Sequence, residues 1–385
     1  MTDSPSFVSK LAWNLPWMVR YPWTRLRSYG EMTAFEKKHV VITIADHFEP
    51  AWNDGPFWDL KGQIRRLKEF REMARRIAAL VRDVDDTGFR HTFFYPAEQY
   101  DPSILEIMSE MQAEGLGETE VHLHHGGYDV ADTSENLRRT LLEFRDTLAE
   151  RHRLLSRTDP NSDPMYAFVH GNLALGNSSG GQHCGVDDEL QILRETGCYI
   201  DMTLPSAPDR SQVPMLNQIY EPGRPLDAPV PHRTGRRVAA DGRDPRLPMI
   251  LTGPLVFYLP RRFAGLPLPR LDDGALAGNQ AFSPERLRRW MSANVTVAGR
   301  SDLVFVKLYC HGFFDHDQQA CIGEDAIRFF SELLERSNRN GEPTIHFASA
   351  RETFNMVCAA IDGKTGEPNQ YRNYRLRPIM AEGKV

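Results

Sequence analysis

The sequence lacks the features that mark membrane-spanning, disulfide-bonded and nucleic-acid-binding proteins. None of the apolar runs in its 385 residues approaches the roughly 20 residues that a membrane-spanning helix needs. Its five cysteines are scattered without C-x-x-C spacing and its N-terminus has no compact apolar signal core, which favours a reducing, cytoplasmic location. The formal net charge of −6 and the absence of a long Lys/Arg run argue against a nucleic acid as partner.

Residues 1–35 form an aromatic and basic arm ahead of the main domain. Between residues 7 and 30 the chain has three tryptophans and four basic residues but no acidic residue. This composition is typical of a membrane–water interface, so we expect either peripheral membrane contact or packing of the aromatic side chains on the main domain. Pro16 and Pro22 argue against one continuous amphipathic helix in the arm.

Apolar, β-rich segments alternate with helical patterns along the rest of the chain. Apolar residues recur at helical spacing over 60–83, Asp101 and Pro102 predict the start of a second helix, and Asp132 with Glu135 resembles a capping box. Strands that alternate with helices are typically parallel, so we predict a single α/β domain over 36–385. Our first choice is a closed or nearly closed (β/α) barrel of seven strands, and an open doubly wound sheet is the second. The predicted strands are 39–45, 91–96, 119–125, 165–171, 198–204, 302–311 and 344–349.

The segment from about 205 to 300 interrupts this alternation. Prolines crowd it, and only MILTGPLVFYLP, residues 249–260, suggests a strand. Long segments of this kind inside a compact domain are often functional lids. We therefore expect a Pro-rich insertion over the mouth of the barrel.

Side chains that can bind metal follow five of the predicted strands, at the end where barrel active sites lie. In the run EVHLHHG, strand alternation places His122 and His124 on one face, whereas His125 falls on the other face or in the next turn. Imidazoles and carboxylates that converge at one mouth suit a divalent metal with a position open for water. The residues at these strand ends are Asp46, His47 and Glu49; His122, His124 and His125; His170 and Asn172; Asp201; and His311, Asp315 and His316.

Three runs resemble a polysaccharide deacetylase of the NodB-homology type, the carbohydrate esterase family 4 group. They are VITIADHFEP, HTFFYPAEQYDPSILEIMSEMQAEGLGETEVHLHHG and VFVKLYCHG, and the resemblance covers residues 39–350 apart from the Pro-rich segment. It implies metal-dependent removal of an acyl group from a carbohydrate. It matches Asp46 to the family's metal-binding aspartate, His124 to its first metal histidine and His311 to the late-strand histidine that acts as general acid.

The sequence also departs from the family pattern. The aspartate that serves the family as general base falls on Ala45, and the second metal histidine falls on Tyr128. His122 or His125 could replace the lost ligand, because H-x-H on a strand can chelate one metal from a single face. The family's arginine–proline motif becomes His170-Gly171-Asn172, which implies altered substrate contacts.

These matches and departures give a mechanistic hypothesis. A divalent ion, Zn²⁺ by its preference for imidazole and carboxylate, would activate water and polarise an amide or ester carbonyl of a carbohydrate. One side chain would accept the water proton and another would protonate the leaving amine. The expected ligands are Asp46, His122 and His124, the expected catalytic groups are His47 or Glu49 and His311, and the expected substrate-binding or orienting groups are His170, Asn172 and Asp201.

Two other function classes fit the same residues. Related barrels include glycoside hydrolases, in which Glu49 or Asp201 together with Asp315 would form the carboxylate pair. A non-catalytic carbohydrate-binding protein could have kept the fold and lost the base at position 45. The sequence does not predict the sugar, the acyl group or the oligomeric state.

Overall fold

One large sheet organises the part of the chain that the computed structural model describes, namely residues 7–32, 38–52, 58–126, 131–259, 269–280, 282–337 and 342–382. In these residues eleven strands pair in the order β12-β13-β1-β2-β3-β5-β6-β9-β7-β8, and β14 also pairs with β1. Pairing is parallel from β12 to β9, whereas β7 is antiparallel to both of its neighbours. The strands are β1 (His39–His47), β2 (His91–Pro96), β3 (Gly117–Leu123), β5 (Tyr166–His170), β6 (Cys198–Asp201), β7 (Gln218–Pro222), β8 (Gly235–Arg237), β9 (Met249–Thr252), β12 (Ala275–Leu276), β13 (Leu303–Cys310) and β14 (Thr344–Phe347).

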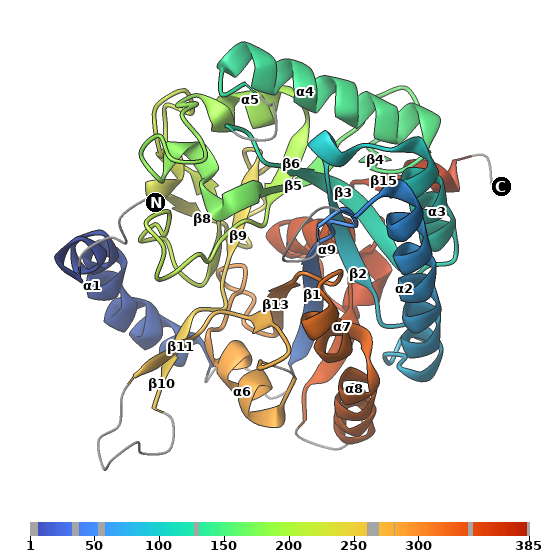
Figure 1. The fold of residues 1–385 in the computed structure, drawn as a ribbon. Helices are drawn as coiled ribbons and strands as arrows, with labels where there is room; N and C mark the ends of the chain where they lie inside the picture. The colour runs from blue at the N-terminus through green and yellow to red at the C-terminus, as the bar shows by residue number, and fades with distance from the viewer. Residues whose placement is uncertain are drawn as a thin grey trace.

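Helices surround this sheet on its outer face (Figure 1). Their apolar residues form one cluster with every second residue of β1, namely Val40, Ile42 and Ile44. Two short strand pairs, β4 (Ser156–Arg157) with β15 (Arg377–Pro378) and β10 (Val256–Tyr258) with β11 (Arg270–Asp272), lie outside the main sheet. The outer helices are α2 (Leu60–Leu80), α3 (Pro102–Ala113), α4 (Ser134–Asp146), α5 (Glu189–Glu195), α6 (Pro284–Ser292), α7 (Asp315–Ile322) and α8 (Glu324–Ser337).

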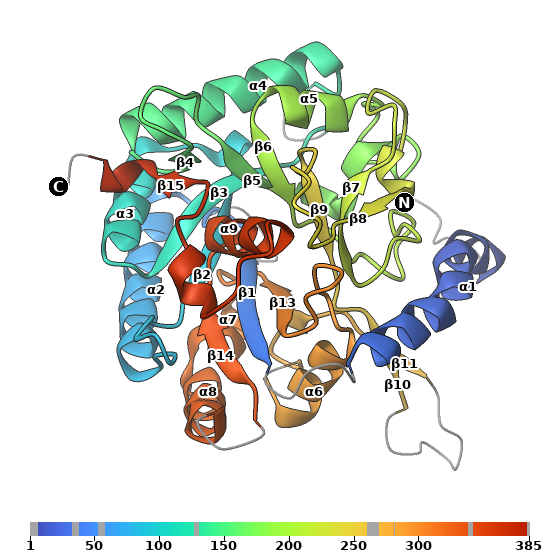
Figure 2. The same ribbon diagram turned by 180° about the vertical axis from the view of Figure 1, so that it is seen from behind.

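The inner face of the sheet is covered by α9 (Ala350–Ile361), which crosses the centre of the molecule in Figure 2. All residues of α9 are buried, and Phe354 and Val357 pack in a second cluster with Val41 and Ala45 of β1. Successive residues of β1 therefore point alternately to the outer helices and to α9, as the period of two in a strand requires. This alternation decides which strand-end side chains can meet.

The structure confirms the α/β class and the parallel strands, but not the closed barrel. Among the described strands no pairing joins β12 to β8, so the path of the sheet stays open. The strands at the two ends have only two and three residues, and such short strands offer few backbone groups for a closing pairing.

Each of the seven predicted strands is present, as are the three predicted helices. Asp101 caps α3 as expected, because its carboxylate accepts a hydrogen bond from Ser103 N at 2.8 Å. The predicted cap of α4 is wrong by one residue. Thr133 is the cap, and the Asp132 carboxylate instead accepts a hydrogen bond from Gly185 N at 2.5 Å.

The Pro-rich segment is part of the sheet and not only an insertion over its mouth. It supplies β7, β8 and β9 at one end and β12 at the other. Ile219 of β7 and Leu251 of β9 are buried on the inner face with the α9 residues. These strands are two to five residues long and stand among prolines, so that only the stretch containing β9 and β10 gave a strand signal.

The N-terminal arm forms α1 (Phe7–Met32), a helix that continues through Pro16 and Pro22. Our prediction that these prolines interrupt the helix is wrong. Trp17 is buried against Phe257 with ring centroids 5.6 Å apart, and Ser28 donates a hydrogen bond to the Ala293 carbonyl at 3.0 Å. This packing stabilises the helix although each proline removes one backbone hydrogen bond. No helix in the described ranges is long and apolar enough to cross a bilayer.

Candidate metal centre

Glu49, His122 and His124 bring three ligand atoms together at the C-terminal ends of β1 and β3. The Nε2 atoms of His124 and His122 lie 3.3 Å and 3.9 Å from Oε1 of Glu49. All three side chains are buried. Their ligand atoms lie within 4.8 Å of one another, so this group could hold a metal ion.

Hydrogen bonds behind the two imidazoles fix their orientation. His122 donates from Nδ1 to the Val169 carbonyl at 2.7 Å, and His124 donates from Nδ1 to Oε1 of Glu98 at 2.5 Å. Nε2 of each ring then faces Glu49, and Nε2 of the neutral His122 carries a lone pair. Nε2 of His122 is fully buried and has no hydrogen-bond partner among the described residues. A buried lone pair that accepts nothing is unfavourable, and a cation at this place would satisfy it.

Two further histidines stand beside this group. The ring centroid of His47 is 4.9 Å from that of His122 and 4.8 Å from that of His311. His311 also stacks on Phe314 at 4.8 Å. Burial lowers the pKa of both His47 and His311, that of His47 far below its usual value, so both imidazoles are neutral at neutral pH.

Burial also acts on the groups that face one another. It raises the pKa of Glu49 to about 7 and lowers the pKa of His122 well below its usual value. His124 behaves differently: burial alone would lower its pKa, but the hydrogen bond to Glu98 and the charge of Glu49 outweigh burial and raise this pKa. Without a cation, burial therefore disfavours the charged forms of Glu49 and His122.

The structure does not bring Asp46 into this group, contrary to our predicted ligand set. Asp46 accepts hydrogen bonds from His91 Nδ1 at 2.9 Å and from Gly312 N at 2.7 Å. Strand alternation is the reason, because Asp46 follows Ile44 to the outer face whereas His47 follows Ala45 to the inner one. The hydrogen bond from Gly312 N to Asp46 holds the loop that carries His311. Only glycine fits at position 312, because a Cβ atom there would lie 2.3 Å from the Asp46 carboxylate.

None of the predicted substrate-binding residues belongs to the Glu49 group. Asp201 is buried and accepts hydrogen bonds from Thr203 N and Oγ1 at 3.1 and 2.7 Å. Asn172 is exposed and adopts a left-handed backbone conformation with φ 57°. His170 contacts His125 and not the Glu49 group. Asp315, which the glycoside hydrolase alternative requires, pairs with Arg66 at 2.6 Å, and Tyr128 lies outside the described residues.

Sequence reasoning missed Glu98, the carboxylate behind His124. Glu98 lies two residues after β2, in the sequence PAEQ. We considered only strand ends that carry an aspartate or histidine, and extending the search to glutamate at the end of β2 would have included Glu98. The described residues contain four more groups that could hold an ion, namely His125, His170, Cys184 and Glu189; Asp46, His91 and Cys310; His39, His346 and Glu367; and Asp83, Asp85 and His346.

Comparison with known proteins assigns no family to this arrangement: no family model matches the chain, and no curated protein matches its sequence significantly.

Proposed function

We propose that the protein is a metal-dependent hydrolase that removes an acyl group, N-acetyl in the first place, from a sugar or polysaccharide. The resemblance of its strand-end motifs to NodB-type deacetylases supports the substrate class. In this proposal the parallel strands from β13 to β9 are an opened counterpart of the seven-stranded barrel of that family. The observation that carries the proposal is the buried Nε2 of His122, which has no hydrogen-bond partner in the described part of the chain and faces a carboxylate and a second imidazole.

The residues of this group have the donor chemistry of a zinc site. Two imidazole nitrogens and one carboxylate oxygen are a common protein ligand set of catalytic zinc, which leaves one position open. Glu98 behind His124 and the Val169 carbonyl behind His122 are the outer partners that metal-binding histidines usually have. Glu49 takes the place that the family pattern gives to Asp46.

The proposed reaction uses two histidines of the chain for proton transfer. A divalent ion held by Glu49, His122 and His124 would lower the pKa of a bound water and polarise the acyl carbonyl. His47, a neutral imidazole beside His122, accepts a proton from the attacking water. His47 passes this proton to the neighbouring His311, and His311 gives it to the leaving nitrogen, which restores both neutral residues. Water and amide thereby become a carboxylic acid and an amine.

The test measures metal content and acetate release from N-acetylglucosamine oligomers with the full-length protein. We expect His122→Ala to lose one equivalent of metal and more than about 10²-fold in activity, because it removes the ligand atom itself. His311→Ala should keep the metal while kcat falls by about 10²–10⁴-fold, the usual contribution of a positioned acid or base.

His152→Ala is the matched control. His152 is also buried, but it contacts Tyr100 and belongs neither to the Glu49 group nor to the group that contains His125 and His170. It should keep both metal and activity. Full metal content in His122→Ala would contradict the ligand assignment. Release of reducing ends without acetate would favour the glycoside hydrolase, and sugar binding without turnover would favour the binding protein.

A further inference from the structure

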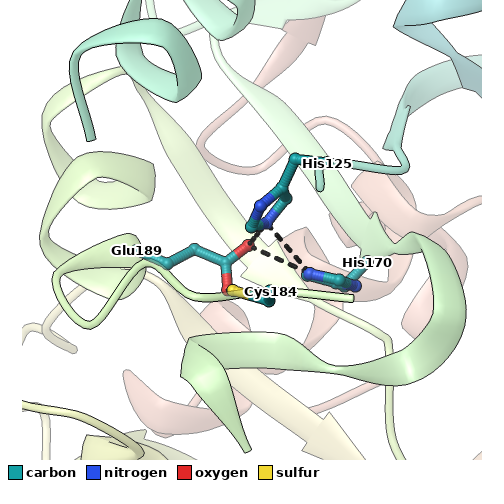
Figure 3. A group of neighbouring side chains, drawn as sticks. All are labelled: His125, His170, Cys184 and Glu189. Carbon is teal, nitrogen blue, oxygen red and sulfur yellow. Dashed lines mark hydrogen bonds and ion pairs between the residues drawn. The ribbon is translucent and has the colours of Figure 1, made fainter. Parts of the chain in front are cut away.

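Four buried side chains from separate segments meet next to the proposed centre (Figure 3). His125 follows β3, His170 ends β5, Cys184 lies in the connection after β5, and Glu189 begins α5. Each is at most 1% exposed. We propose that these four residues form a second metal site that binds Zn²⁺ and stabilises the fold.

The ligand atoms of this cluster all face a common point. Nε2 of His125 lies 3.0 Å from both Nε2 of His170 and Oε1 of Glu189. Nε2 of His170 is 3.6 Å from the same carboxylate oxygen, and Sγ of Cys184 is 3.6 Å from the other one. Imidazole, thiolate and carboxylate are the three side-chain types that bind zinc, and structural zinc sites use four of them.

Protons held on the far side of each ring make this arrangement favourable for a cation. His125 donates from Nδ1 to Asp132 at 3.1 Å, and His170 Nδ1 lies against the Gly171 carbonyl. Ala174 N donates to Nδ1 of His170 at 3.2 Å when this atom carries a lone pair, and the Gly171 carbonyl accepts from the same atom when it carries the proton, as it would with zinc on Nε2. Nε2 of His125 also donates to Oε1 of Glu189 at 3.0 Å, and a divalent ion would take the place of this proton between the carboxylate and the two Nε2 atoms.

The position of the cluster indicates a structural role. All four coordination positions come from the protein, which leaves none for a substrate. The chain between His170 and Glu189 has only 3-10 turns as regular structure, and it includes four non-glycine residues with positive φ, namely Asn172, Leu173, Asn177 and His183. An ion bound to both ends and to Cys184 would hold this irregular segment against β3, β5 and α5.

Cobalt replacement tests this site separately from the Glu49 centre, which has no cysteine. In the full-length protein loaded with Co²⁺, a thiolate ligand produces a near-ultraviolet charge-transfer band that imidazole and carboxylate ligands do not produce. We expect this band in the wild type and in His122→Ala, and its loss in Cys184→Ser. Cys184→Ser should also bind zinc more weakly by about 100-fold or more, since loss of an outer partner alone typically costs 10–100-fold.

Cys198→Ser is the matched control, because Cys198 is also buried, donates to the Ile200 carbonyl at 3.5 Å and belongs to no candidate metal group of the described residues. It should keep the band. His170→Gln provides a second variant if Cys184→Ser does not fold, and it should lose one zinc equivalent. A cobalt-loaded wild type without the band, or a band that survives in Cys184→Ser, would show that the cluster is only a hydrogen-bonded network and would overturn the proposal. Loss of the metal at the Glu49 centre alone, as in His122→Ala, should leave the cobalt–thiolate band unchanged.

A separate observation concerns the outward face of α1, which projects at the edge of the molecule (Figure 1). Large apolar side chains recur on it every three or four residues, and they are between 38% and 74% exposed. A monomeric protein rarely exposes a continuous apolar stripe of this length. The exposed residues are Val8, Leu11, Leu15, Met18, Val19, Trp23, Leu26 and Tyr29.

We propose that this face of α1 lies on the surface of an anionic membrane. Lys10 and Arg20 are exposed on the same helix, and residues 7–30 contain no acidic side chain. The next acidic residue along the chain, Glu31, is paired with Arg237 at 2.6 Å. Apolar residues, tryptophan and positive charge on one helix are typical of helices that lie in the plane of a membrane interface.

Co-sedimentation with vesicles tests this proposal. We expect the full-length protein to bind vesicles of phosphatidylcholine with phosphatidylserine more tightly than vesicles of phosphatidylcholine alone. The double variant Trp23→Glu with Leu26→Glu should bind more than about 10-fold more weakly. Val84→Glu, which changes an apolar side chain 53% exposed elsewhere on the surface, should bind like the wild type. Failure to bind vesicles, or a dimer in light scattering that only the double variant dissociates, would overturn the membrane assignment.

Discussion

Four buried histidines in this protein are each held by a hydrogen-bond acceptor on Nδ1, which leaves Nε2 to face the interior of a cluster. The acceptors are the Val169 carbonyl behind His122, Glu98 behind His124, Asp132 behind His125 and the Gly171 carbonyl behind His170. Two acceptors are carboxylates and two are carbonyls, so each cluster has one imidazole with a charged partner and one with a neutral partner. A carboxylate behind the ring raises the basicity of the opposite nitrogen and thereby its strength as a ligand.

Glu98 is the best residue for testing this effect. We expect Glu98→Gln to weaken zinc binding at the Glu49 centre by about 10–100-fold, because the amide can still accept the Nδ1–H of His124 but carries no charge. Competition with a chromogenic chelator measures the change. Glu106→Gln, which removes the charge of an exposed glutamate on α3, should leave the affinity unchanged. Equal affinities of Glu98→Gln and wild type would contradict the role of Glu98.

At the scale of single elements, strand alternation explains which site residues could be predicted. The H-x-H spacing predicted His122 and His124 on one face and His125 away from it, and the structure places them so. Asp46 was chosen by motif similarity, and the period of two in β1 directs it to the face opposite His47. Glu98 follows its strand within a 3-10 turn, and no alternation rule extends there.

Proline misled the prediction of elements in two opposite ways. In α1 two prolines were read as breaks, but tertiary packing through Trp17 and Ser28 outweighs the local cost. Between 205 and 300 the prolines separate strands of two to five residues, and patterns of this length are too short to identify a strand from sequence. Long, periodic elements such as α2 and β13 were predicted with small errors at their ends.

At the scale of the whole molecule, charged groups cross the interior between distant strands. Lys307 of β13 is buried and donates hydrogen bonds from Nζ to the Met202 and Leu204 carbonyls after β6, at 3.0 and 2.7 Å. Burial lowers the pKa of Lys307 to about 8. Burial likewise raises the pKa of Asp201, at the end of β6, to about 7. The inner face is therefore stabilised by polar links whose charge depends on pH.

Asp201 predicts a specific pH dependence of stability. Its folded-state pKa is raised, so its contribution is fully present below the unfolded-state pKa and is lost as the pH rises through about 7. Ionisation of this carboxyl should lower the free energy of unfolding by on the order of 2–4 kcal/mol as the pH rises from about 4 to about 8. Asp201→Asn cannot ionise, so its urea unfolding should show a smaller decline over that range.

Asp227→Asn, at an exposed position, should follow the wild-type profile. In Asp201→Asn the new side-chain amide can still accept a hydrogen bond from Thr203 N and donate one to Thr203 Oγ1, so the native hydrogen-bond geometry persists. Parallel profiles for Asp201→Asn and wild type would contradict the assignment.

The position of β1 in the sheet has a consequence for synthesis of the chain. One side of β1 pairs along nearly its whole length with β13, and four of its residues pair on the other side with β14. More than 250 residues must therefore follow β1 before its neighbour β13 is complete. At about 5–20 residues per second the ribosome needs on the order of tens of seconds to make them. During that time the edge of the apolar first strand that later pairs with β13 is open, so we expect the nascent chain to need chaperones to avoid aggregation.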